Sequence, residues 1–457
     1  MPAERTRRAL LALGILLLGA WLVLMVLGLT HESWLPGRDG KPASLWVPRF
    51  ALRGRVWFPA MSFQSLDFIH VFASVQTWVR GGDPYEAILG DPISTRYSWP
   101  PITLPLFSWC RFFPFQPIRT PGWTGPILFL PREAVVAYTL LLGAIVGAAG
   151  WAAHRQRERL GLGRLPWPLI IGLFVWSTPV LFALERGNLD LLVLLSILLA
   201  AACLRPRTTA GDIAAGVLLA VGTWIKLYPA LLVFAILFLR RWRTLAAYVA
   251  AGLLVPLAQF HTIPRWLAQN GILSAVAGIG PRTGIGATIG SIDVISHPLF
   301  NAWIGAWTSG PLAVLDRVPA RLVALMVVVP AIVLVGNRVS RSTHRDALAL
   351  PLLLWVVAMA TFVPNVSNDY NLAPLPLAVL CLIDRRDRWE LAGLALLFLW
   401  WQPFDLRTGP ASAAFWDLAL NLGKVCGVVM VGVLLARRAA AAPLPAQVSR
   451  APHPAPR

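Results

Sequence analysis

Charged residues are scarce in this chain of 457 residues: they make up 13% of it, and only 21 residues are Asp or Glu. Hydrophobic residues make up 57%, and the mean hydropathy is +0.65. Soluble domains carry about 25% charged residues, so this composition excludes a soluble domain of ordinary composition. The short alternating segments of a membrane β-barrel are also lacking. The sequence therefore predicts an all-α polytopic membrane protein.

Cysteine is rare as well. Cys110, Cys203, Cys381 and Cys426 are scattered singly, without a CxxC spacing, and predict neither a disulfide framework nor a zinc site. No cofactor is expected. A DxD-like pair of aspartates is lacking too, which argues only mildly against a metal and leaves the metal requirement open.

The 40 Lys and Arg residues give the chain a net charge of +19, a balance that can indicate nucleic-acid binding. Their positions argue against nucleic acid as a partner, because they form short clusters beside apolar runs. The clusters are Arg155, Arg157 and Arg159; Arg205 and Arg207; Arg240, Arg241 and Arg243; Arg338, Arg341 and Arg345; Arg385, Arg386 and Arg388; and Arg437 and Arg438. This distribution is typical of the cytoplasmic side of a membrane protein, so membrane lipids are the expected partners.

The clusters predict about twelve spans in the plasma membrane, with both termini in the cytoplasm. The spans include 9–30, 133–151, 165–184, 244–260 and 321–335, and the first is expected to stay as an uncleaved anchor. One membrane domain then covers 1–436. It carries a large extracytoplasmic loop at 30–131 and a Gly-rich outer loop at 261–311. The Pro/Ala-rich tail, 437–457, is expected to be disordered.

Segment 213–239 lies between two arginine clusters, so it is expected to enter and leave the membrane on the same side. Trp224 to Pro229 interrupt it near the midpoint, which predicts two short helices of about thirteen residues each. Lys226 then lies deep in the membrane. Such an ammonium group either faces an anion or cavity, or reaches the interface as an ordinary snorkelling lysine.

The loop at 30–131 contains a polar stripe. Asp67, His70, Ser74 and Thr77 recur at helical spacing between apolar residues, and Gly81-Gly82 follow. This pattern predicts an amphipathic helix over 64–80 that turns the stripe to water or to a cavity. The stripe is either a solvated face or the setting of a general base, since a carboxylate beside a hydroxyl can accept its proton.

Tyr97-Ser98-Trp99-Pro100-Pro101 cannot lie inside a helix, because the paired prolines lack N–H donors. This run is either a rigid connector or part of a carbohydrate pocket, in which Tyr97 and Trp99 stack on a sugar.

The motifs follow one another in the order found in glycosyltransferase family 87, which the chain resembles over about 67–371. They are Asp67 with Gly82-Asp83-Pro84-Tyr85; Tyr97 to Pro101; Glu185-Arg186-Gly187-Asn188-Leu189-Asp190; and Lys226-Leu227-Tyr228-Pro229 with Arg240-Arg241-Trp242-Arg243. The resemblance implies a GT-C-like bundle of about twelve transmembrane helices. The chain departs from some mannosyltransferases of the family at 367–371: they have a histidine in this region, and this chain has none.

The resemblance further implies transfer of a sugar, mannose or in some members arabinofuranose, from a polyprenyl-phosphate donor. The acceptor is a cell-envelope glycolipid or polysaccharide, and the reaction occurs at the extracytoplasmic face with inversion. Asp67 matches the family's base, and Lys226, Arg186 and Arg282 are candidates for binding the donor phosphate. Candidates for binding the sugar or acceptor are His70, Tyr85, Tyr97, Trp99, Tyr228, Asp369 and Tyr370. A flippase for lipid-linked sugars and a structural subunit stay open as alternatives.

Overall fold

The computed structural model describes residues 2–30, 33–36, 42–45, 66–85, 99–113, 117–118, 127–128, 132–269, 320–362, 369–400 and 410–441. Within them, the chain is a bundle of helices with two small antiparallel strand pairs, β1 (Ser33–Pro36) with β2 (Pro42–Leu45), and β3 (Pro117–Ile118) with β4 (Ile127–Leu128). The all-α class predicted from composition is confirmed.

The helices follow the predicted apolar segments closely. The first eleven are α1 (Pro2–Thr30), α2 (Leu66–Val79), α3 (Thr103–Leu106), α4 (Arg132–Arg159), α5 (Trp167–Val175), α6 (Thr178–Arg186), α7 (Asp190–Cys203), α8 (Thr209–Ile225), α9 (Leu232–Phe238), α10 (Trp242–Leu257) and α11 (Ile263–Gln269). The later ones are α15 (Ala320–Arg341), α16 (Ala349–Ala360), α17 (Pro374–Leu382), α18 (Arg388–Trp400) and α19 (Pro410–Ala440). Three short 3₁₀ helices are η1 (Ser108–Phe112), η2 (Tyr228–Leu231) and η5 (Asp369–Leu372).

Within the described part of the chain, two helices are long and apolar enough to cross a membrane, over Glu4–Val23 and Glu133–Arg159. Five further helices are apolar but shorter. The number of spans, about twelve, therefore stays a prediction, as do the sides on which the two termini lie.

The core of the bundle is formed by helices that are apolar on every face. Every residue of α16 and of α17 is buried, and the two helices pack against each other and against α19. By contrast, α1 packs on α5 and leaves most of its described apolar side chains exposed. Helices that are hydrophobic all round belong in an interior or in lipid, so this arrangement suits a membrane-associated protein.

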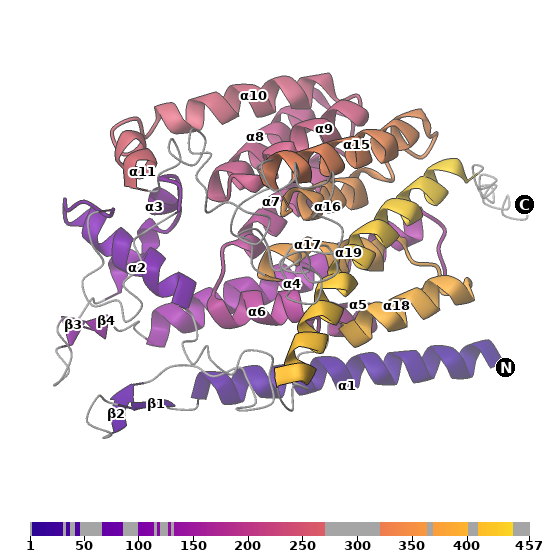
Figure 1. Cartoon of the computed structure of the whole chain (residues 1–457), viewed down its shortest axis with the longest axis horizontal. Helices are drawn as coiled ribbons and strands as arrows, with labels where there is room; N and C mark the ends of the chain where they lie inside the picture. Colours follow the sequence, from indigo (N-terminus) through magenta and orange to yellow (C-terminus); the bar gives the residue numbers. More distant parts are fainter. Residues whose placement is uncertain are drawn as a thin grey trace, which may run out of the picture.

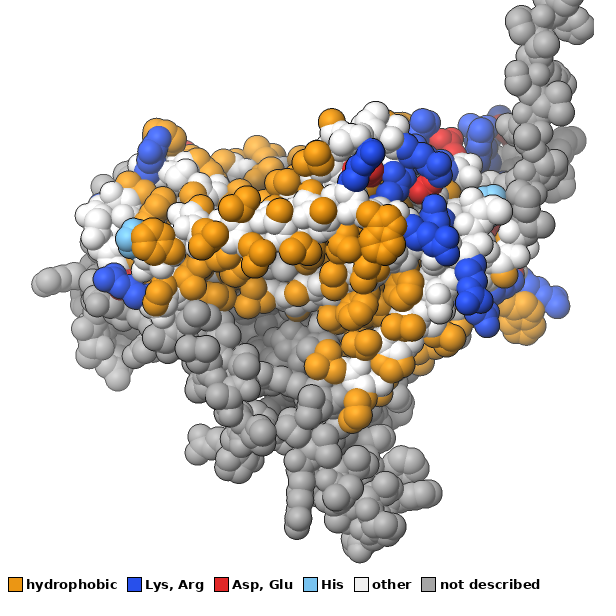
Figure 2. Space-filling view, turned by 90° about the horizontal axis from the view of Figure 1, so that it is seen from above, with side chains coloured by type: hydrophobic (Ala, Val, Ile, Leu, Met, Phe, Trp, Pro, Cys, Tyr) orange, Lys and Arg blue, Asp and Glu red, His pale blue; other side chains and the backbone are white. Residues whose placement is uncertain are grey.

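The two ends of the bundle differ in charge. Helix α1 begins and α19 ends at one end, whereas α2, α3 and α11 lie at the other (Figure 1). On the face seen from above, hydrophobic side chains cover the middle, and most Lys and Arg side chains gather toward one end (Figure 2). This gathering fits the clusters predicted from the sequence.

Two predicted segments differ in the structure. The span predicted at 165–184 is two helices, α5 and α6, because Pro179 lacks an N–H and its ring would clash with the carbonyl of Val175, where α5 ends. Helix α19 continues to Ala440 and so includes the first four residues of the predicted tail. Residues 442–457 of that tail and the glycines of the loop predicted at 261–311 lie outside the described residues.

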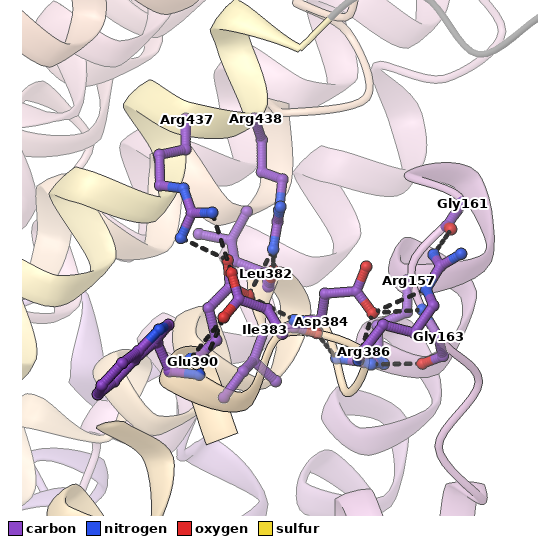
Figure 3. A network of polar contacts seen from close by, with 12 residues as sticks. Arg157, Gly161, Gly163, Leu382, Ile383, Asp384, Arg386, Glu390, Arg437 and Arg438 are labelled. Atoms are coloured by element: carbon purple, nitrogen blue, oxygen red, sulfur yellow. Dashed lines mark hydrogen bonds and ion pairs between the residues drawn. The ribbon is translucent and has the colours of Figure 1, made fainter. Parts of the chain in front are cut away.

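The arginine end is held together by a network of polar contacts (Figure 3). The Arg157 guanidinium, which is 1% exposed, joins α4 to the end of α17, and Glu390 at the start of α18 forms ion pairs with Arg437 and Arg438 of α19. Asp384 accepts hydrogen bonds from the backbone N–H of Gly163 at 3.1 Å and from Arg386. These contacts fix the ends of four helices, α4, α17, α18 and α19, relative to one another.

A second network surrounds Asp346, in the connection between α15 and α16. Its carboxylate pairs with Arg207 and, at 2.9 Å, with Arg241, and Arg241 also binds Asp212 at 3.1 Å. Partial burial acts to raise the pKa of Asp346, but the two arginines outweigh it and lower that pKa below 3.8.

Replacing Asp346 with asparagine is expected to lower the free energy of unfolding on the order of 1 kcal/mol at pH 7. Because the folded-state pKa is depressed, this stabilisation is present above pH 3.8 and is lost as the pH falls through the lower, folded-state value. Thermal unfolding in detergent at pH 7, 5 and 3 measures the difference. If the difference in stability between wild type and Asp346→Asn stays constant down to pH 3, the stabilising role of the Asp346 carboxylate is contradicted.

Candidate functional site

Lys226 lies where α8 ends, at the end of the bundle opposite the arginines. Pro229 cannot continue α8, because its ring would clash with the carbonyl of Ile225, which is the last residue of the helix. The backbone of Lys226 is extended, with φ −146° and ψ 121°, and η2 begins two residues later. The predicted interruption is confirmed, but the arms are unequal: α8 has 17 residues and α9 has seven.

Asp190 lies at the same end, as the first residue of α7. Helix α6 ends at Arg186, Gly187 takes a left-handed conformation, and the Asn188 side chain accepts a hydrogen bond from the Asp190 N–H at 2.8 Å. Helices α7 and α8 are neighbours, and Gly222 of α8 has no room for a side chain because a Cβ would lie 2.1 Å from the Ser196 hydroxyl oxygen. This close approach brings Asp190 and Lys226 together.

The Asp190 carboxylate, which is 0% exposed, contacts two side chains of the neighbouring segment. One oxygen lies 3.5 Å from the Lys226 Nζ, and the other accepts a hydrogen bond from the Tyr228 hydroxyl. The Lys226 side chain is 17% exposed, and its ammonium lies 5.8 Å from the centre of the Trp99 ring. A lysine ammonium has three N–H donors, so this geometry lets it contact both a carboxylate and a second anion.

Trp99 links Lys226 to α2. Its ring centre is 6.0 Å from that of His70, and its backbone carbonyl accepts a hydrogen bond of 3.5 Å from the Tyr85 hydroxyl. Tyr85 and His70 are buried, whereas Trp99 is half-buried. The structure thus brings together five residues singled out from the sequence: His70, Tyr85, Trp99, Lys226 and Tyr228.

Helix α2 forms as predicted and ends where predicted. The N–H groups of Gly81 and Gly82 donate to the carbonyls of Trp78 and Thr77, both at 3.0 Å, and Gly81 has φ +81°. The polar stripe was predicted to turn to water or to a cavity, and the structure excludes water for two of its members: His70 is 6% and Ser74 1% exposed. The chain that follows α2 lies against these side chains: the Trp99 ring is 6.0 Å from the His70 ring, and the Ser74 hydroxyl donates to the Pro84 carbonyl at 3.4 Å.

The turn after α2 is held by Asp83. One carboxylate oxygen accepts the Tyr85 N–H at 2.9 Å, which is an Asx-turn, and the other forms an ion pair with Arg265 of α11 at 2.9 Å. Nearby, burial raises the pKa of the Cys110 thiol to about 12, so this cysteine stays protonated.

Several predicted site residues have undescribed side chains. Asp67 lies in the first turn of α2, Arg186 is the last residue of α6, and Asp369 and Tyr370 begin η5. Tyr97 and Arg282 lie outside the described residues altogether. The backbone of η5 packs against α6, which places residues 369–372 beside the helix that leads to Asp190.

Sequence reasoning missed Asp190 as a site residue, although it belongs to a quoted motif. The available indication was a single carboxylate at the start of an otherwise apolar helix, DLLVLLSILLAAAC. Charged residues are rare in such helices and usually face a partner.

The model of glycosyltransferase family 87 matches residues 97–273. The matched region contains Trp99, Asp190, Lys226 and Tyr228, whereas Asp67 and His70 precede it. A search of the curated proteins found no match. The match over these residues, together with the ordered motifs that lead to the Asp190–Lys226 contact, supports membership of glycosyltransferase family 87, a family of membrane-associated glycosyltransferases.

Proposed function

We propose that this glycosyltransferase transfers a sugar, mannose in preference to arabinofuranose, from a polyprenyl-phosphate donor to a cell-envelope glycolipid or polysaccharide. The reaction takes place at the extracytoplasmic end of the bundle. The observation that carries the proposal is the Lys226 ammonium, which lies beside an aromatic ring at the end opposite the arginines. Helix α8 has 17 residues and is therefore about 25 Å long. Lys226 follows its last residue, whereas Arg205 and Arg207 precede its first, so the ammonium is far from these arginines.

A donor of this class requires a cation close to lipid. Its tail dissolves only in the bilayer and its phosphate is anionic, so the reacting bond must lie where an apolar surface meets a polar site. Lys226 suits this requirement, because its stem follows an apolar helix and its Nζ is still 3.5 Å from a carboxylate and 5.8 Å from the Trp99 ring centre.

The proposed reaction is a single in-line displacement. The acceptor hydroxyl oxygen attacks the anomeric carbon, the bond from that carbon to the phosphate oxygen breaks, and its electron pair leaves with the polyprenyl phosphate. The acceptor proton goes to the Asp67 carboxylate. Negative charge grows on the leaving phosphate, so a fixed Lys226 ammonium stabilises the transition state more than the bound donor.

The position of α2 supports Asp67 as the base. His70 is one helical turn after Asp67, about 4.5 Å along the axis, and its ring is 6.0 Å from the Trp99 ring that Lys226 also contacts. The first turn of α2, which contains Asp67, is therefore close to Trp99, and Trp99 lies between this turn and Lys226.

The test is transfer by the purified full-length protein from a panel of radiolabelled polyprenyl-phosphate sugars to envelope glycolipids. We expect transfer from at least one donor, and we expect Lys226→Met to lower kcat/KM for that donor by about tenfold to a hundredfold, because a charge-assisted contact to phosphate is lost. The matched control is Arg243→Met, an exposed cation of α10 that donates to Thr209 at the start of α8, and it should leave kcat/KM within twofold.

An unchanged rate of Lys226→Met at limiting donor would refute the role of this lysine. Movement of donor lipid between leaflets without any sugar transfer would instead support a flippase and overturn the proposed function.

A further inference from the structure

Asp190 is a buried carboxylate that the proposed reaction does not use. It touches Lys226 and Tyr228 from a different helix, and it is 0% exposed whereas Lys226 is 17% exposed. A buried carboxylate is costly unless it is paired and hydrogen-bonded, so a role for it should be sought in these contacts.

We propose that Asp190 is a positioning residue, which holds the Lys226 ammonium beside Trp99 at the place where the donor phosphate binds. This inference rests on the proposed function, because it assigns to Lys226 a phosphate as second partner. Asp190 itself does not touch the substrate.

The need for such a residue follows from the lysine side chain. Its four-carbon stem has about 2 kcal/mol of rotamer entropy, and a lysine near the membrane surface tends to extend its ammonium toward water. The ion pair of 3.5 Å to Asp190 opposes this tendency, and the Trp99 ring lies on another side of the ammonium at 5.8 Å.

Asp190 is in turn well held. The Tyr228 hydroxyl donates to the oxygen that does not face Lys226, and the residue lies at the positively polarised start of α7. Its backbone N–H is fixed by the Asn188 side chain at 2.8 Å. The carboxylate is therefore anchored from two elements before any donor binds, and it offers the lysine a fixed partner.

The experiment is a double-mutant cycle on the full-length protein: wild type, Asp190→Asn, Lys226→Met and the combined variant. Asn keeps an acceptor for the Tyr228 hydroxyl but removes the charge. We expect Asp190→Asn to raise the donor KM by about tenfold. Asp190→Glu, which keeps the charge, should raise the donor KM by less than Asp190→Asn does. The donor KM of the combined variant should differ less than twofold from that of Lys226→Met.

The matched control is Asp212→Asn. Asp212 is also buried and also ion-paired, with Arg241 at 3.1 Å, but it lies at the opposite end of α8. We expect this variant to lose thermal stability with a donor KM within twofold of wild type. If Asp190→Asn likewise loses only stability, or if its effect multiplies with that of Lys226→Met, the positioning role is overturned.

Binding of a short-chain polyprenyl phosphate without sugar, measured by thermal shift, separates this inference from the proposed function. If wild type binds the lipid and Asp190→Asn binds it equally well, the positioning role alone fails. If wild type neither binds this lipid nor uses any donor of the panel, the proposed function fails.

Discussion

Asp67→Asn is expected to lower the rate of sugar transfer by about a thousandfold or more, while the affinity for the donor lipid stays near that of wild type. An amide cannot accept the acceptor proton, so the oxygen that attacks the anomeric carbon stays a neutral, poor nucleophile. The donor contacts proposed at Lys226 are unaffected. The measurement is kcat at saturating donor, together with binding of the polyprenyl phosphate.

Asp83→Asn is the matched control, because Asp83 belongs to the same predicted loop and is also a carboxylate. Its contacts are structural: an Asx-turn, which asparagine can also form, and an ion pair with the 65% exposed Arg265. We expect its rate within a few-fold of wild type. Normal turnover of Asp67→Asn would rule out this residue as the base, and equal losses in both variants would assign the loss to the loop structure.

Arg157→Met is expected to destabilise the fold by about 3 kcal/mol or more. The guanidinium is 1% exposed and donates to the carbonyls of Leu380 at 3.0 Å, Gly163 at 2.6 Å and Ile383. The carbonyls of Leu380 and Ile383 lie at the end of α17, where helix carbonyls lack intrahelical partners. Methionine fills the space of the stem but leaves these acceptors buried without a donor.

Thermal unfolding in detergent compares Arg157→Met with Arg159→Met, two residues further along α4. Arg159 is exposed, so its replacement should change the unfolding free energy by less than about 0.5 kcal/mol. Equal stability of the two variants would show that Arg157 does not hold α17. Arg157→Lys should recover only part of the loss, because one ammonium cannot span the carbonyls that the guanidinium reaches.

Local features near the site were predictable because they depend on neighbouring residues. Gly81-Gly82 end α2, and the chain breaks before Pro229, both as the sequence predicts. The break between α5 and α6 follows the same rule as that after α8, since in both cases the helix ends four residues before a proline. The prediction of one continuous span at 165–184 overlooked Pro179.

Proline alone does not decide where helices end. Pro330 lies inside α15, which continues to Arg341, and Pro256 lies inside α10. Neighbouring helices can satisfy the carbonyl that a proline leaves unpaired, so the outcome depends on packing. For the same reason the burial of His70 and Ser74 was not predictable, because the segments that cover them follow α2 in the sequence.

The sequence by itself determined the helical class, the segments that form helices and the gathering of arginines at one end, because hydropathy, proline and clustered charge act locally along the chain. Only the tertiary structure decided that Asp190 meets Lys226 and Tyr228, and that Trp99 lies between Lys226 and His70. These contacts join separate elements, and their distances are set by how closely α7 and α8 approach at Gly222 and by the path of the chain between α2 and α3.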